Sequence, residues 1–110
     1  MTTLDELCQA IDSIGLPWAN MNFERGDDVS PPYVVLRKAG GNVSGANDSA
    51  WCHLVEYDVE LYTTRRDYAL ERTVMDALDG SGIFFDDGGF WAIPEQGMVE
   101  AVFTVTVREN

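Results

Sequence analysis

The side chains best suited to bind a metal ion are few in this 110-residue chain. The single histidine, His53, follows Cys52, and the only other cysteine is Cys8. Adjacent residues on a strand point to opposite faces, so His53 and Cys52 do not converge on one ion. A structural zinc site also needs four ligands at recurring spacings, which are absent. Both cysteines lie in apolar patterns typical of small buried side chains. We therefore expect no metal ion and no other cofactor.

The sequence also lacks a pattern for nucleophilic or phosphate chemistry. No serine lies in a Gly-x-Ser-x-Gly elbow. Gly80-Ser81-Gly82 follows an expected helix instead of preceding it, so a C-terminal helix cap explains it better than a phosphate loop does. The carboxylate pairs Asp27-Asp28 and Asp86-Asp87 occur in turn-like segments, where water solvates them and acid and base roles do not separate. We expect a protein without enzymatic activity.

Charge is the least ordinary global feature of the chain. Its 19 Asp and Glu residues face 7 Lys and Arg residues, which gives a formal net charge of −12. Such a surface repels phosphate and anionic lipid, so sequence-independent nucleic-acid binding and binding to anionic membranes are not expected. Three explanations stay open: solubility alone, a basic protein partner, or a surface that lies near nucleic acid without adhering to it.

We expect neither a membrane span nor a secretion signal. No apolar run approaches the roughly 20 residues that span a bilayer. The N-terminal segment MTTLDELCQA is acidic and lacks the basic-then-apolar order of a secretory signal, so we expect synthesis in the cytoplasm.

Two amphipathic helices are expected, each with one apolar face. Thr3-Leu4-Asp5-Glu6 is a capping box, and the apolar stripe that follows it ends at Gly15-Leu16-Pro17. A second stripe follows Asp67, whose carboxylate is placed to cap a helix N-terminus. The segment Asp79-Gly80-Ser81-Gly82 ends this second helix.

Strands are expected where apolar residues alternate with polar ones or run between turn signals. Residues 55–61 and 98–107 alternate with a period of two. Shorter strands are expected at 33–36 and 83–85, and residues 90–93 form a short strand or a turn. Residues 17–32 hold either a loop anchor or a short strand. The segments 39–50 and 86–89 are rich in Gly, Asn and Asp and are expected to be a long flexible loop and a turn.

This order of elements predicts a single domain over residues 1–110 of the α+β class. We expect a mainly antiparallel sheet of about four strands, with both helices packed on one face. The opposite face carries Glu56, Asp58, Glu60 and Glu100 and is therefore expected to be wet or oligomeric.

The central segment, YDVELYTTRRDYALERTVMDALDGSGIFF, resembles the small tail terminator or tail completion proteins of long-tailed bacteriophages. These proteins share a Y-x-V-E-L-Y-T strand, a D-x-x-x-E-x-x-V helix and a Gly-Ile-Phe strand. They also share a proline-preceded strand upstream and an alternating strand near the C-terminus. The counterparts here are Tyr57–Thr63, Asp67–Val74, Gly82–Phe84, Pro32–Leu36 and Met98–Val107.

The resemblance implies a virion structural protein without catalytic activity. Proteins of this family form a ring, typically hexameric, on the head-proximal end of the tail tube, where they end tube polymerisation and join the tail to the head. The implied partners are further copies of the chain, the major tail tube protein and the head–tail connector or stopper protein, while DNA passes through the lumen without specific binding. Tyr68 departs from the pattern, since many relatives have proline there.

Two other functions stay open. One is a head-completion or stopper subunit of the same connector. The other belongs to a different class: a small acidic inhibitor, such as an immunity protein or a DNA mimic, that blocks a basic nuclease through its carboxylates.

Candidate contact residues lie in three segments. The long loop is suited to reach a neighbouring ring, and the polar strand residues are suited to a lumen or a subunit contact. The arginine doublet Arg65-Arg66 is either a solvated turn or an ion-pair contact to a neighbouring subunit. The residues are Gly41, Asn42, Asn47 and Asp48 in the loop, Glu56, Asp58 and Glu60 in the strand, and Arg65 and Arg66 in the doublet.

Overall fold

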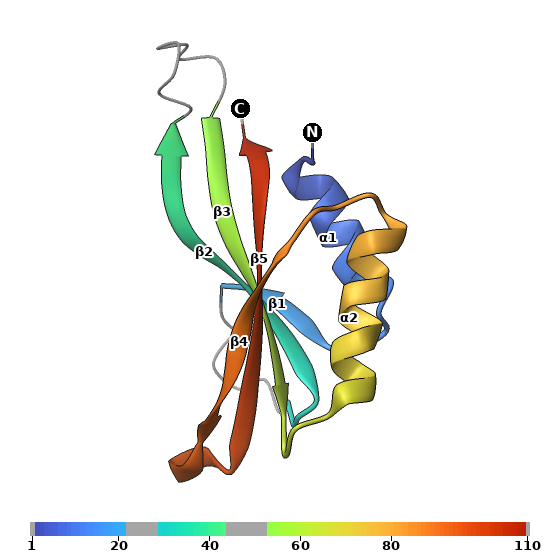
Figure 1. Cartoon of the computed structure of the whole chain (residues 1–110), viewed down its shortest axis with the longest axis vertical. Helices are drawn as coiled ribbons and strands as arrows, with labels where there is room; N and C mark the ends of the chain where they lie inside the picture. Colours follow the sequence, from blue (N-terminus) through green and yellow to red (C-terminus); the bar gives the residue numbers. More distant parts are fainter. Residues whose placement is uncertain (1, 22–28, 44–52, 110) are drawn as a thin grey trace.

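A computed structural model of the chain describes residues 2–21, 29–43 and 53–109 (Figure 1). Two α-helices, five strands and one short 3₁₀-helix make up this part of the chain. In chain order they are α1 (Leu4–Asp12), β1 (Trp18–Asn20), β2 (Tyr33–Val43), β3 (His53–Thr63), α2 (Tyr68–Gly80), β4 (Asp86–Ile93), η2 (Pro94–Gln96) and β5 (Met98–Glu109).

All five strands belong to one sheet, in the order β1-β2-β3-β5-β4. The pairs β2–β3, β3–β5 and β4–β5 are antiparallel, and β1 pairs with β2 in parallel. The α+β class is therefore confirmed, but the sheet has five strands and is mixed. The parallel strand was hard to expect because its three residues are too few to show an alternating pattern.

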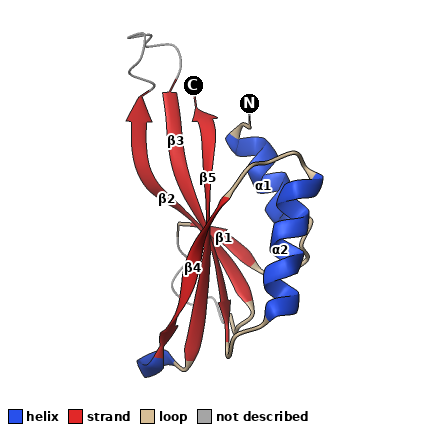
Figure 2. Ribbon diagram, viewed as in Figure 1, coloured by secondary structure: helices blue, strands red, loops and turns tan. Residues whose placement is uncertain are grey.

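One hydrophobic core joins both helices to the three central strands. Figure 2 shows α1 and α2 next to each other on one side of the sheet. Side chains on alternate positions of the strands point toward this side, as the period of two requires. The buried cluster contains Leu7, Ala10 and Ile11 from α1, Val74 and Leu78 from α2, and Val34, Leu36, Val55, Tyr57, Val59, Leu61, Ile83, Ala101, Phe103, Val105 and Val107 from the sheet and its connection to α2.

Both helices begin at the caps that the sequence predicts. At α1 the backbone N–H of Glu6 donates to Thr3 Oγ1 at 3.3 Å, and the Thr3 N–H donates to Glu6 Oε1 at 3.1 Å, which completes the capping box. At α2 the Leu70 N–H donates to Asp67 Oδ1 at 3.0 Å. The first helix ends at Asp12, before the predicted stop signal that begins at Gly15.

The segment after α2 differs from the prediction. Residues 83–85 are not a strand, because Ile83 is buried in the core and its N–H donates to Leu78 O at 2.9 Å, which caps the helix. The expected turn at residues 86–89 is the first half of β4. Its glycines form a bulge in the pairing with β5: Gly89 has φ +90° and donates its N–H to Asp87 Oδ1 at 2.9 Å. The glycine and aspartate residues that predicted a turn therefore form a β-bulge in the edge strand.

The expected loop over residues 39–50 is also shorter than predicted. Residues 39–43 extend β2 and pair with the start of β3, with an irregularity between Lys38 and Gly40. A glycine pair at a bulge keeps strand pairing possible where composition alone indicates a loop. The remainder of the predicted loop, with Asn47 and Asp48, lies outside the described residues.

Candidate functional site

One row of side chains crosses four strands on the sheet face opposite the core. The pairing register places Tyr33 of β2, Tyr62 of β3, Glu100 of β5 and Trp91 of β4 directly opposite one another. The two tyrosine rings stack with their centroids 5.1 Å apart, and the Trp91 side chain hydrogen bonds to Glu100. We call these four residues the cross-strand row.

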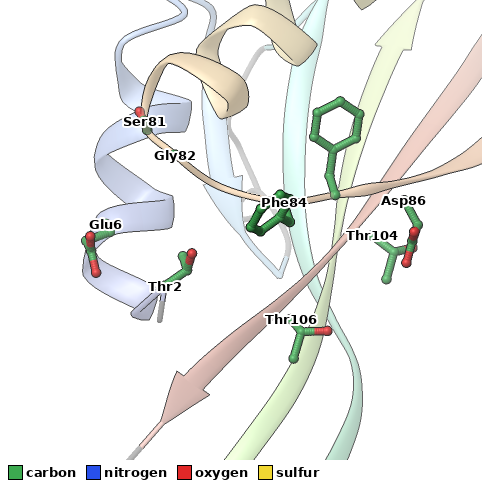
Figure 3. Close-up of a pocket in the computed structure, with 9 residues that line it drawn as sticks. Thr2, Glu6, Ser81, Gly82, Phe84, Asp86, Thr104 and Thr106 are labelled. Atoms are coloured by element: carbon green, nitrogen blue, oxygen red, sulfur yellow. The ribbon is translucent and has the colours of Figure 1, made fainter.

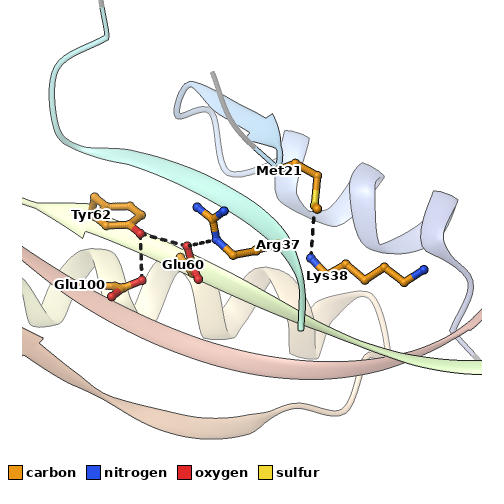
Figure 4. Close-up of polar contacts among 6 residues, drawn as sticks. All are labelled: Met21, Arg37, Lys38, Glu60, Tyr62 and Glu100. Carbon is orange, nitrogen blue, oxygen red and sulfur yellow. Dashed lines mark hydrogen bonds and ion pairs between the residues drawn. The ribbon is translucent and has the colours of Figure 1, made fainter. Parts of the chain in front are cut away.

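Two buried glutamates meet at the centre of this row (Figure 4). The hydroxyl of Tyr62 lies 2.9 Å from Glu60 Oε1 and 2.9 Å from Glu100 Oε2. Arg37 Nε–H donates to the same Oε1 of Glu60 at 3.2 Å. Glu60 and Glu100 are only 6% and 7% exposed. Of the two alternatives predicted for this face, wet or oligomeric, exposure to water does not hold for these two residues within the chain. Tyr62 contacts both of them, and Arg37 contacts Glu60.

The hydroxyl of Tyr62 has one proton, so it can donate to only one of the two carboxyl groups. Arg37 places a positive charge beside Glu60, so the Glu60 carboxyl group is well placed to accept this proton. When Glu100 is protonated, it can instead donate its own proton to the Tyr62 oxygen. Burial raises the pKa of Glu100, and nearby Glu60 raises it further, whereas hydrogen bonds from Tyr62 and Trp91 and the charge of Arg37 lower it, with a net rise. Burial also raises the pKa of Tyr62, followed by its hydrogen bonds to Glu100 and Glu60.

The polar side chains of this network form hydrogen bonds with one another. Every buried side-chain nitrogen or oxygen atom in the described residues has a hydrogen-bond partner. The same residues contain no group of three or more His, Cys, Asp or Glu side chains that could hold a metal ion. The network can therefore hold strands together as a buried polar contact.

The other predicted strand residues lie on the same face. Glu56 is exposed, and Asp58 is half-buried and accepts a hydrogen bond from Thr104 Oγ1 at 2.9 Å. The structure thus brings Glu56, Asp58 and Glu60 to one face, as the alternation predicts, but only Glu56 is fully open to solvent. Gly41 and Asn42 lie in β2, opposite Val55 and Leu54.

The basic doublet separates into two environments. Arg65 is exposed, whereas the guanidinium of Arg66 is held within its own chain. Its Nε and Nη2 donate to the two carboxylate oxygens of Glu71 at 3.1 and 3.3 Å. The same group lies 3.3 Å from the ring centroid of Phe90 and 4.5 Å from that of Tyr68. Arg66 therefore links the start of α2 to β4, a contact that sequence reasoning did not anticipate.

The edge strand β4 is the most exposed element of the sheet. It is last in the strand order, and seven of its eight residues are exposed, with Ile93 half-buried. Phe90 and Trp91 are both 47% exposed although they point to opposite faces of the strand. An edge strand with exposed aromatics on both faces is unusual in a chain that stays alone. The adjacent pair Phe90-Trp91 was the feature of the sequence that could have indicated this edge strand. The turn predicted at residues 86–89 shortened the expected strand and so obscured the feature.

A hollow of about 610 Å³ lies where α2 connects to β4 (Figure 3). Its walls come from the start of α1, the end of α2, the connecting segment and the outer edge of β5. Phe84 stands at this hollow with 95% of its surface exposed. The lining residues used below are Glu6, Phe84, Asp86, Thr104 and Thr106.

Comparison of the chain with protein-family models and with curated proteins found no match. Within the described ranges, no helix is both long enough and apolar enough to cross a membrane.

Proposed function

We propose that this protein is a virion structural subunit that acts by assembly and not by catalysis. In this proposal, copies form a ring, hexameric as in the tail terminators that the sequence resembles, on the head-proximal end of a phage tail tube. The ring ends tube polymerisation and joins the tail to the head connector. The observation that carries the proposal is the exposed β4 edge, with Phe90 and Trp91 each 47% exposed on its two faces.

The pairing pattern supports an edge contact through β4. Along a strand of an antiparallel ladder, the backbone N–H and C=O groups of one residue point to the neighbouring strand on one side, and those of the next residue point to the other side. Arg108 donates its backbone N–H to Thr2 O at 2.8 Å, away from β3, so even-numbered residues of β5 face outward from β3. Glu100 therefore faces Trp91 in the ladder, and Ala92 turns its N–H and C=O to the open edge. These groups are free to pair with another copy.

The arrangement of a helix layer on one face of the sheet suits assembly with other copies. The helices pack on one face and shield it, so that the strand edges and the opposite face are left for contacts with other copies. If the β4 edge of one copy contacts a different surface of the next, the contact is heterologous, and a heterologous contact that closes produces a ring of fixed size. Closure removes the exposed edge that would otherwise invite uncontrolled pairing.

The net charge of −12 fits the same proposal. DNA must pass the lumen, and an acidic wall disfavours its adhesion over about a Debye length, roughly 8–10 Å. Glu56 is an acidic strand residue suited to such a wall, because it is exposed on the face away from the helices. A pore lined mainly by arginine side chains would contradict this part of the proposal.

The acidic charge also favours a second candidate, an inhibitor of a basic nuclease. Such an inhibitor would act as a monomer and bind its target through carboxylates. A stopper subunit of the connector is a third candidate, which shares the ring but contacts the head side.

The test is a tube-length assay. Purified major tail tube protein is polymerised with and without this chain, and the products are imaged by negative-stain electron microscopy. We expect rings at one end of each tube and growth that stops at that end. Tubes that grow equally long in its presence, with no rings bound, would refute the terminator function, and rings that bind only the head connector would favour the stopper.

A further inference from the structure

A second contact surface lies at the hollow beside β5, away from the open edge of β4. β4 begins opposite Thr104, and the N-terminal segment bridges to β5 at Arg108 through Thr3. Thr106 lies between these two points, and no residue of the described chain is registered opposite it on this edge. The strand edge is therefore interrupted at the floor of the hollow.

The backbone groups of Thr106 point into this gap. Arg108 turns its N–H outward to Thr2 O at 2.8 Å, and Thr104 faces Asp86 of β4 on the same edge. Groups two residues apart in a strand point to the same edge, so the N–H and C=O of Thr106 face the hollow. One residue of an extended segment can form both hydrogen bonds there, as in strand addition to an open sheet edge.

The walls of the hollow define which side chains such a segment would carry. Phe84 is 95% exposed, and a phenylalanine that open to water is covered favourably by an apolar side chain. The charged residues of the lining are Glu6 and Asp86, both exposed and both acidic. Hydrogen bonds from the backbone N–H and the hydroxyl of Thr3 lower the pKa of Glu6, so its negative charge persists into mildly acidic solution.

We propose that this hollow, lined by Glu6, Phe84, Asp86, Thr104 and Thr106, binds an extended basic segment of another protein. One backbone residue of the segment pairs with Thr106, an apolar side chain covers Phe84, and lysine or arginine side chains meet the two carboxylates. The charged residues of the lining are both carboxylates, so charge complementarity favours a basic segment as the occupant. The inference does not depend on ring formation.

The test uses two capped hexapeptides as probes, one alternating lysine with leucine and one alternating glutamate with leucine. Binding to the full-length protein is followed by amide NMR shifts and by titration calorimetry. We expect the basic peptide to shift and protect the amide of Thr106, and the acidic peptide to leave it unchanged. Because burial of a phenylalanine is worth about tenfold or more in affinity, Phe84→Ala should weaken binding of the basic peptide by about that factor.

Matched charge variants decide whether the hollow is the site. Asp86→Asn should weaken the basic peptide severalfold, whereas Asp76→Asn, which removes an exposed carboxylate from α2, should not. Equal losses in both variants, or an unshifted Thr106 amide, would overturn the proposal. Phe84 is exposed, so Phe84→Ala is expected to fold, and its amide spectrum checks this directly.

The same samples separate this inference from the proposed function. If the mass of the protein shows a ring and the peptide fails to bind, only the proposal of peptide binding at the hollow is refuted. If the peptide binds a monomer, only the ring is refuted. Pairing of the peptide with β4 instead of β5 would appear as protection of the Ala92 amide and would also overturn the proposal that the peptide binds at the hollow.

Discussion

Replacing Glu100 with glutamine tests the proton count in the buried network. A glutamine amide can donate to the Tyr62 oxygen, as the protonated carboxyl does, while the Tyr62 hydroxyl continues to donate to Glu60. Glu100→Gln should therefore preserve the fold at mildly acidic pH. At alkaline pH it should be more stable than the wild type, because glutamine cannot lose a proton and become a second buried charge.

The size of the effect follows from the geometry. The two carboxylate oxygens each lie 2.9 Å from the Tyr62 hydroxyl, so two charges there would stand at most about 6 Å apart. Their repulsion is about 3 kcal/mol at an effective dielectric constant of about 20. Arg37 beside Glu60 offsets part of this. We expect the advantage of Glu100→Gln over the wild type to grow by about 1–2 kcal/mol between about pH 5 and about pH 9.

The sign follows from linkage. The pKa of Glu100 is raised in the folded state, so the unfolded state loses this proton first as the pH rises. The stability that the protonated group contributes is complete at low pH and is lost as the pH rises through the folded-state pKa. Urea unfolding at fixed protein concentration measures this, and values close to the sequence pI of about 4.1 are avoided because uncharged proteins associate.

Glu56→Gln is the matched control. It removes one formal charge from the same strand face, but Glu56 is exposed. It corrects for the general self-repulsion of an acidic protein at high pH. Identical pH profiles for the two variants would refute the proton count, as would a Glu100→Gln variant that loses stability relative to the wild type as the pH rises.

Three further changes test the fold. Thr3→Ala removes the capping box of α1 and should lower the free energy of unfolding by about 1 kcal/mol in urea titrations; an unchanged value would show that the box contributes nothing. Phe103→Ala removes a ring that is 1% exposed and packs edge-to-face on Phe85 with centroids 5.8 Å apart, and should cost about 3–5 kcal/mol in thermal unfolding. Gly97→Ala places a side chain at φ +63° and should cost about 1–2 kcal/mol, whereas Gly80→Ala at the end of α2 should cost nothing; equal effects would contradict the backbone argument.

Local patterns in the sequence predicted the elements whose environment is simple. The capping box at Thr3, the cap at Asp67 and the alternation along β3 and β5 each depend on residues close in sequence, and each is confirmed. The prediction of a turn around Gly88 was wrong because the residues that favour turns also occur at β-bulges. A side chain at Gly88 would lie 3.2 Å from the carbonyl oxygen of Val102 on the neighbouring strand, which sequence alone does not show.

The polar network was beyond local patterns for a different reason. An acidic residue on the outer face of a strand is expected to be wet, and Glu56 is. Glu100 is buried because the register of the sheet places Tyr62 and Trp91 of the neighbouring strands opposite it, and Glu60 contacts Arg37 of β2 and Tyr62 of its own strand. Register joins segments far apart in the chain, so a pattern read within one strand could not pair these groups.

The most direct test of assembly through β4 is the mass of the protein in solution, measured by light scattering coupled to size exclusion over a range of concentrations. We predict a wild-type species that is a multiple of the 12.2 kDa chain. Ala92→Pro removes an N–H at the open edge and should give a folded monomer, whereas Ala92→Ser keeps that N–H and should assemble like the wild type. A wild type that stays monomeric at high concentration, or an Ala92→Pro variant that assembles as well as the serine control, would contradict the account.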